Sequence, residues 1–139
     1  MAKVRDIMQK NVVTVDVNKT ALEAATILKE KDISFLVIVQ DDKPIGIVTE
    51  RDFVRKVVTE DKQASKIPLT EIMSPKFRSV GPSTEIDDAV QKMLNFNIRP
   101  LLVLEDDTLV GVITQTDLTG FLRSKILIND TVKNIESEG

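Results

Sequence analysis

The alternation of hydrophobic and polar positions predicts short strands and amphipathic helices in the first half of the chain. A β-branched run at residues 12–15 predicts a strand. Thr20 and Glu23 have the spacing of a capping box, which predicts a helix that begins there and ends near Asp32. The nearly continuous apolar run at residues 33–39 then predicts a strand that is buried on both faces.

Residues 41–58 complete the first half, and the second half follows the same plan. After a turn at residues 41–44, the pattern predicts a hairpin strand at residues 45–49 and a helix at residues 51–58. The order of strand, helix, strand, strand and helix then returns. Its predicted strands are residues 77–80, 101–104 and 109–114, and its predicted helices are residues 85–95 and 117–123.

An internal repeat explains this recurrence. Residues 46–52 (GIVTERD) return as residues 111–117 (GVITQTD), an offset of 65 positions (111 − 46). Both segments have a glycine, two apolar residues, a threonine, two variable residues and an aspartate. The same offset aligns Ile7-Met8 with Ile72-Met73 without a gap. Because units of about 60 residues bury too little surface to be stable alone, we expect the two halves to share a core.

The domain organisation follows from the repeat. We predict an α+β protein in which two small related halves pack on each other, because two copies of this length do not suit a solenoid. The predicted parts are repeat 1 at residues 4–58, a polar linker at residues 59–68, repeat 2 at residues 69–123 and a C-terminal tail at residues 124–139, to which no structure is assigned.

Composition restricts the function more than the fold. The chain of 139 residues has no cysteine and no histidine, which excludes disulfides, thiol nucleophiles, imidazole bases and the usual zinc ligands. We therefore expect no enzyme, no metal site and no required cofactor. The net charge of −3 makes nucleic acid an unlikely partner. No apolar run approaches the ~20 residues that cross a bilayer, and the start lacks a secretory signal, so a cytoplasmic protein is expected.

The repeated motif has two interpretations. Thr49 with Asp52, and Thr114 with Asp117, have the spacing of a helix N-cap and a carboxylate at the third helical position. The same parts suit a nucleoside phosphate, because backbone N–H groups and a hydroxyl can bind phosphate while a carboxylate accepts hydrogen bonds from a ribose diol. No nucleophile stands beside a base, which favours binding over turnover. The basic residues of the helix after the first motif, Lys56 among them, are expected to be a solvated face.

On these residues the chain resembles a tandem pair of CBS domains, also called a Bateman module. The resemblance covers about residues 4–123 and depends on the doubled motif, on the lead-ins Asp6-Ile7-Met8 and Glu71-Ile72-Met73, and on the order of the elements. It implies a β-α-β-β-α fold for each half and a pseudo-two-fold axis between them. It also implies clefts between the halves for AMP, ADP, ATP or S-adenosylmethionine. The chain departs from the usual pattern in having Val37 and Leu102 where proline is common, and hairpin turns without glycine.

The resemblance also implies which residues contact the ligand. Thr49, Asp52, Thr114 and Asp117 would contact ribose and phosphate. The adenine would be held by strand residues of both repeats, without assignment to one cleft or the other. These residues are Thr14, Val15, Ile33, Ser34 and Ile47 in repeat 1, and Ser79, Val80, Ile98 and Val112 in repeat 2. For Ile33 and Ile98, as for Leu36 and Leu101, burial in the core is the competing interpretation.

The two predicted sites are not equivalent. Ser34 in repeat 1 corresponds to Arg99 in repeat 2, and a guanidinium group makes stronger contacts with phosphate than a hydroxyl group does. The hypothesis is that the site reached by Arg99 prefers more phosphorylated ligands. The competing interpretation is a solvated surface arginine ahead of Pro100.

Three functions remain open at this stage. The first is a stand-alone regulatory module with an adenine nucleotide as regulatory ligand, which acts as a homodimer and signals to an unknown protein effector. The second is a structural dimerisation or association module whose motifs are only helix caps. The third and weakest is a nucleic-acid binder, which would show a steep salt dependence.

Overall fold

The structure is a computed structural model that describes the backbone of residues 1–97 and 99–138 and the side chains of residues 1–97 and 99–126. The chain folds into two units. The first-repeat unit comprises Asn11–Phe77 and Asp106–Leu109, and the second-repeat unit comprises Met1–Lys10, Arg78–Glu105 and Val110–Gly139. Each repeat contributes a three-stranded sheet and helices, which confirms the predicted α+β plan of two repeated units.

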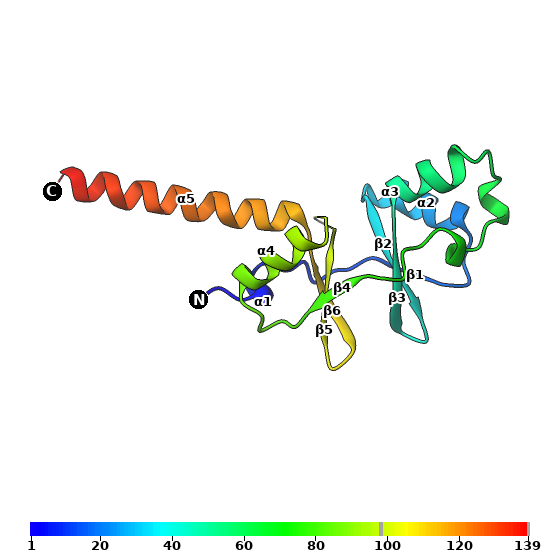
Figure 1. Ribbon diagram of the computed structural model, residues 1–139, viewed down its shortest axis with the longest axis horizontal. Coiled ribbons are helices and arrows are strands. Elements are labelled where there is room, and N and C mark those ends of the chain that lie inside the picture. Colours follow the sequence, from blue (N-terminus) through cyan, green and yellow to red (C-terminus); the bar gives the residue numbers. More distant parts are fainter. Residues whose placement is uncertain (98, 139) are drawn as a thin grey trace. The chain divides into compact units, whose positions relative to one another are not determined.

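The strands and helices follow the predicted order in both repeats (Figure 1). The elements of the first-repeat unit are β1 (Thr14–Asp16), α2 (Ala21–Lys31), β2 (Phe35–Gln40), β3 (Lys43–Thr49), α3 (Glu50–Phe53), the π-helix η1 (Val54–Val58) and the 3-10 helices η2 (Ala64–Lys66) and η3 (Leu69–Glu71). The elements of the other repeat, preceded by the short helix α1 (Val4–Ile7), are β4 (Arg78–Val80), α4 (Ile86–Asn95), β5 (Leu101–Glu105), β6 (Thr108–Ile113) and α5 (Gln115–Glu138).

Both sheets have the same topology. In the first, β1 pairs with β2 in parallel and β2 pairs with β3 in an antiparallel hairpin; the second has the order β4-β5-β6. The hairpin turns contain Asp41-Asp42 and Asp106-Asp107, all four with positive φ values between 51° and 66°. Aspartate tolerates the left-handed region better than most residues, so these turns form without glycine.

The capping box predicted before α2 is confirmed. The Thr20 hydroxyl accepts a hydrogen bond from the Glu23 backbone N–H at 3.2 Å, and the Glu23 carboxylate accepts one from the Thr20 N–H at 3.2 Å. The helix ends at Asp32, which takes a left-handed conformation (φ 53°) as the C-cap.

Each hydrophobic core is completed by the lead-in segment of the other repeat. In the first-repeat unit, α2 packs on β2 and β3 together with buried Leu69 and Ile72. In the second-repeat unit, α4 packs on β5 and β6 together with Val4 of α1. Val4 and Leu69 are both 0% exposed and are related by the repeat offset. The lead-in of repeat 1 therefore belongs to the unit of repeat 2, whereas the lead-in of repeat 2 belongs to the unit of repeat 1.

Two helices differ from their predictions. The predicted helix at residues 51–58 becomes a short α-helix followed by a π turn, which buries Val57 and leaves Val54 and Val58 exposed. The predicted helix at residues 117–123 extends as α5 to Glu138 (Figure 1). In the part of the chain that the structure describes, no helix combines the length and apolar character needed to cross a membrane.

Candidate functional site

The first Thr-x-x-Asp motif forms a complete helix cap at the junction of β3 and α3. The Oδ2 atom of Asp52 accepts hydrogen bonds from the Thr49 backbone N–H at 2.8 Å and from the Thr49 hydroxyl at 3.2 Å. In return, the Asp52 N–H donates to Thr49 Oγ1 at 3.3 Å. Both side chains are half-buried. The capping interpretation of this motif is therefore correct as far as the backbone is concerned.

The second motif repeats this geometry where β6 leads into α5. Asp117 Oδ2 accepts hydrogen bonds from the Thr114 N–H at 2.8 Å and from its hydroxyl at 2.9 Å, and the Asp117 N–H donates to Thr114 Oγ1 at 3.3 Å. In both copies the cap uses mainly one carboxylate oxygen, Oδ2. The other oxygen, Oδ1, remains an acceptor for groups outside the cap.

A different side chain lies at Oδ1 in each copy. The Lys56 ammonium group is 3.3 Å from Asp52 Oδ1 and donates to the carbonyl oxygen of Ile72 at 3.0 Å. At the second motif, the Gln9 amide nitrogen is 3.1 Å from Asp117 Oδ1. Lys56 was expected on a solvated face, and the structure instead pairs it with the motif carboxylate, as its i,i+4 spacing from Asp52 could have indicated. Gln9 carries no comparable sequence signal.

The motif glycines are required by close packing against the lead-in methionines. A Cβ atom at Gly46 would lie 2.8 Å from Met73 Sδ, and one at Gly111 would lie 2.6 Å from Met8 Sδ. Each lead-in also pairs with the edge of the sheet, because Ser74 exchanges backbone hydrogen bonds with Ile47 and Gln9 exchanges them with Val112. The recurrence of Ile-Met with the glycine motif thus has a steric cause.

Around the first motif, the sheet brings several predicted residues close together. The Ser34 carbonyl accepts a hydrogen bond from the Glu50 N–H at 2.9 Å, directly beside Thr49. Thr14 is in register with Val37, and Val37 with Ile47, so these three side chains share one face of the sheet.

Two predicted adenine-pocket residues of the first repeat pack elsewhere. Val15 is buried in the core on the face that α2 covers, and the half-buried Ile33 packs against the same cluster. Both side chains pack in the core of this unit. For Val15 the cause is the alternation of the strand, which directs its side chain away from the face of Thr14 and Ile47.

The second repeat places its predicted residues in the same way. Ser79 is in register with Leu102, and Val112 lies on β6 with 2% of its surface exposed. Val80 packs against the second core cluster, as Val15 does in the first. Ile98 lies outside the described residues.

Arg99 belongs to a basic group that has no counterpart in repeat 1. Its guanidinium carbon is 5.7 Å from the centroid of the Phe96 ring, and that of Arg78 is 5.1 Å from the same centroid, which are cation–π distances. At the equivalent positions, repeat 1 has Val13, Lys31 and Ser34. Arg99 is exposed, so two guanidinium groups are available to an anion beside this ring.

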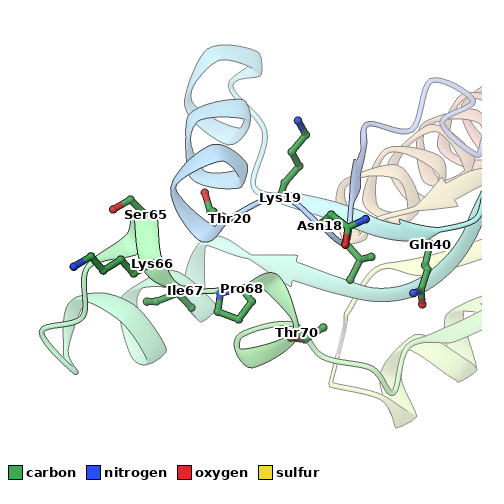
Figure 2. Close-up of a pocket in the computed structure, with 10 residues that line it drawn as sticks. Asn18, Lys19, Thr20, Gln40, Ser65, Lys66, Ile67, Pro68 and Thr70 are labelled. Carbon is green, nitrogen blue, oxygen red and sulfur yellow. The ribbon is translucent and has the colours of Figure 1, made fainter.

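A cavity of about 470 Å³ lies at the end of the first sheet where Gln40 pairs with Lys43, opposite to the end where Phe35 pairs with Thr49. Figure 2 shows the residues that line it. It is lined by the segment after β1, by Gln40, by residues 65–68 and by Thr70. The ammonium groups of Lys19 and Lys66 point away from Pro68 and Thr70 (Figure 2). The first N–H of α2, that of Ala21, already donates to the Ile67 carbonyl at 2.9 Å. We therefore assign the candidate site to the motifs and not to this cavity.

The motif residues are suited to binding. Each copy offers a fixed hydroxyl and a carboxylate oxygen at the start of a helix, which can accept hydrogen bonds from a diol. Among the described residues, no group of three or more histidine, cysteine, aspartate or glutamate side chains is placed to hold a metal ion.

Comparisons with known proteins agree with this organisation. The family model for the CBS domain matches residues 4–59 and again residues 69–124. An uncharacterized protein of Methanopyrus kandleri is 36% identical over 117 residues, which are 83% of this chain. This chain spans 60% of the length of that relative.

Solved structures give the same result. A putative signal-transduction protein with CBS domains from Burkholderia ambifaria superposes with a TM-score of 0.81 at 33% identity, covering 87% of this chain and 93% of the other. The CBS domain pair of protein MJ0100, solved in complex with 5'-methylthioadenosine and S-adenosyl-L-methionine, also has a TM-score of 0.81, with 29% identity and coverage of 90% and 98%.

Proposed function

Because this chain belongs to the CBS-domain family, we propose that it is a regulatory module that binds an adenosine-containing ligand and signals its presence to a partner. The ligand class is AMP, ADP, ATP or S-adenosylmethionine. A CBS domain pair with the same fold and 29% identity was solved with two adenosine derivatives bound, which supports this class.

The observation that carries the proposal is that the two oxygens of each motif carboxylate have different hydrogen-bonding roles. Oδ2 of Asp52 and of Asp117 holds the helix cap, whereas Oδ1 contacts only a side chain from outside the cap among the described residues. A cap alone needs one oxygen. A second oxygen, held at a fixed position beside a threonine hydroxyl, suits a ribose diol.

Residues near the motifs would contact the adenine ring and the phosphate groups of the ligand. In repeat 1, Thr14 and Ile47 share the sheet face on which an adenine ring would lie, and in repeat 2 their counterparts are Ser79 and Val112. Arg99 would contact phosphate. The receiver of the signal would be an unknown protein effector or a second copy of the chain in a homodimer.

Ligand binding is tested by calorimetry and thermal unfolding with AMP, ADP, ATP, S-adenosylmethionine and GMP. We expect adenosine-selective stabilisation of about 2.7 kcal/mol at a ligand concentration of 100 Kd. The double change Asp52→Ala with Asp117→Ala should abolish it, because both diol acceptors are lost.

The control separates binding from capping. The box of Thr20 and Glu23 has the same geometry but lies outside the motifs, so Thr20→Ala removes a cap, costs about 1 kcal/mol of stability and should leave nucleotide affinity unchanged. If folded wild-type protein, freed of co-purified nucleotide, binds none of the five compounds, the proposal is wrong.

The second candidate function is a structural association module. The observation in its favour is that both motifs form complete capping boxes, which accounts for the threonine and the aspartate without a ligand. Under this function the panel gives no shift, and the motif variants lose stability in the same way as Thr20→Ala.

A further inference from the structure

The N-terminal strap, defined as residues 1–10, places a hydrogen-bond donor on the oxygen that a ligand would need. Gln9 Nε2 lies 3.1 Å from Asp117 Oδ1 and 3.3 Å from Oδ2. Oδ2 already accepts two hydrogen bonds from Thr114. The amide of Gln9 therefore donates to Oδ1, the carboxylate oxygen that the helix cap does not use.

The position of Gln9 is fixed by the backbone of the strap. Its N–H donates to the Val112 carbonyl at 2.9 Å, and the Val112 N–H donates back at 3.0 Å. One residue earlier, Met8 packs over Gly111, and Val4 anchors α1 in the core. The strap thus runs from the core of the second-repeat unit to the motif carboxylate.

The corresponding segment of the first-repeat unit does not do this. Ser74 is the counterpart of Gln9 and forms the same pair of backbone hydrogen bonds, with Ile47, at 3.0 and 2.8 Å. The group at Asp52 Oδ1 is Lys56 from the following helix. The direct contact between strap and carboxylate is therefore a property of the second motif.

We propose that Gln9 competes with the ligand for Asp117, so that binding at the second motif releases the end of the strap and makes residues 1–10 the segment that reports occupancy. This proposal rests on the proposed function. Gln9 is exposed and its amide is uncharged, so the contact is weak enough for a diol to replace it. The cap on Oδ2 remains intact during the exchange.

The affinity test uses the full chain with Asp52→Ala, which leaves the second motif as the binding site, and neutral adenosine as the probe. Gln9→Ala and Gln9→Met both remove the donor, and Gln9→Met keeps the side-chain volume. Each should raise adenosine affinity roughly three- to tenfold, the scale of one hydrogen bond. Ser74→Ala, at the equivalent position, should change it by less than about twofold.

The direction of the change in adenosine affinity decides whether Gln9 competes with the ligand. A lower affinity in both Gln9 variants would make Gln9 a ligand contact and overturn the proposal, as would an unchanged affinity; either result leaves the proposed function standing. Absence of adenosine binding in every variant, including Gln9→Ala, would overturn the competition; the proposed function would be overturned with it only if the wild-type protein also binds none of the five compounds of the panel.

Hydrogen exchange tests the release of the strap. In wild-type protein, saturating adenosine should speed exchange of the Val112 amide, whose acceptor is the Gln9 carbonyl, by roughly threefold or more. The Ile47 amide, bonded to Ser74, is the internal control and should not change in the same direction. Slower exchange, or no change, at Val112 with adenosine bound would show that the strap does not report occupancy.

Discussion

The two motif copies have the same cap but different chemical surroundings. Asp52 and Asp117 bind their threonines with closely similar distances, because the cap depends only on residues that the repeat preserves. The groups at Oδ1 are Lys56 in one copy and Gln9 in the other, and Arg99 in the second repeat corresponds to a serine in the first. Selectivity between the sites should therefore arise outside the motif.

The largest expected effect concerns what the copies share, the contact of glycine with methionine. At Gly111 a Cβ atom would lie 2.6 Å from Met8 Sδ and 3.0 Å from the Gln9 carbonyl oxygen; at Gly46 the sulfur distance is 2.8 Å. We expect Gly111→Ala to lower the free energy of unfolding by about 1–3 kcal/mol, and Gly46→Ala by slightly less. Urea unfolding measures both.

The matched control is Gly120 in α5, where a Cβ atom would meet nothing within 4 Å. Gly120→Ala should raise stability by up to about 1 kcal/mol, because alanine is the better helix former. If all three alanine variants gave the same sign, the steric explanation of the motif glycines would fail. Adding Met8→Ala to Gly111→Ala should recover part of the loss.

The next effect concerns a difference between the copies. Arg99→Ala should weaken the binding of ATP at the site that Arg99 reaches by about 1.5 kcal/mol, or roughly tenfold, since a charge-assisted contact with phosphate is lost. Adenosine affinity should not change. Calorimetry with ATP, AMP and adenosine on the Asp52→Ala background and on the Asp117→Ala background measures how the loss of affinity depends on the number of phosphate groups.

Ser34→Ala on the Asp117→Ala background is the counterpart in repeat 1 and should affect ATP and adenosine alike. If Arg99→Ala left nucleotide affinity within about twofold at both motifs, Arg99 would be a surface residue held by Phe96, and the inequality of the two sites would need another cause.

Much of the fold could be predicted because it is encoded in local patterns. The capping box at Thr20, the end of α2 at Asp32 and the two hairpins each depend on a few adjacent residues. The resemblance to a CBS domain pair, carried by the doubled motif, is confirmed by the family match.

The exchange of lead-ins was not predictable in this way. Val4 and Leu69 are apolar residues in short segments, and nothing in their immediate neighbourhood indicates which repeat they complete. The π turn at Val54–Val58 also lacks a local signal. In the tail, the three consecutive apolar residues at 126–128 obscure the helical period, so α5 was predicted too short.

The candidate site was predictable only where it coincides with the repeat. Thr49, Asp52 and their counterparts were identified from the repeat, from their capping spacing and from the resemblance to CBS domains. Gln9 was missed because its counterpart Ser74 differs from it, and because its partner Asp117 lies 108 positions away in the sequence. Contacts of this kind depend on the tertiary fold, and no periodic pattern in the sequence indicates them.

The smallest expected effect is the contribution of the Glu23 charge to stability. This carboxylate caps α2, and no ligand contact is proposed for it. The pKa of Glu23 is lowered from its ordinary value of 4.5 by the hydrogen bond from the Thr20 backbone N–H, and further by the Thr20 hydroxyl and by Lys19. Since the folded protein binds this proton less tightly than the unfolded chain does, the stabilisation is present above pH 4.5 and is lost as the pH falls through the lowered pKa.

Glu23→Gln keeps an acceptor for Thr20 but does not titrate. Urea unfolding at about pH 6 and about pH 3 should show a stability difference between wild type and Glu23→Gln that shrinks at the lower pH. An equal difference at both values would mean that the charge of the Glu23 carboxylate contributes nothing to the stability of this capping box.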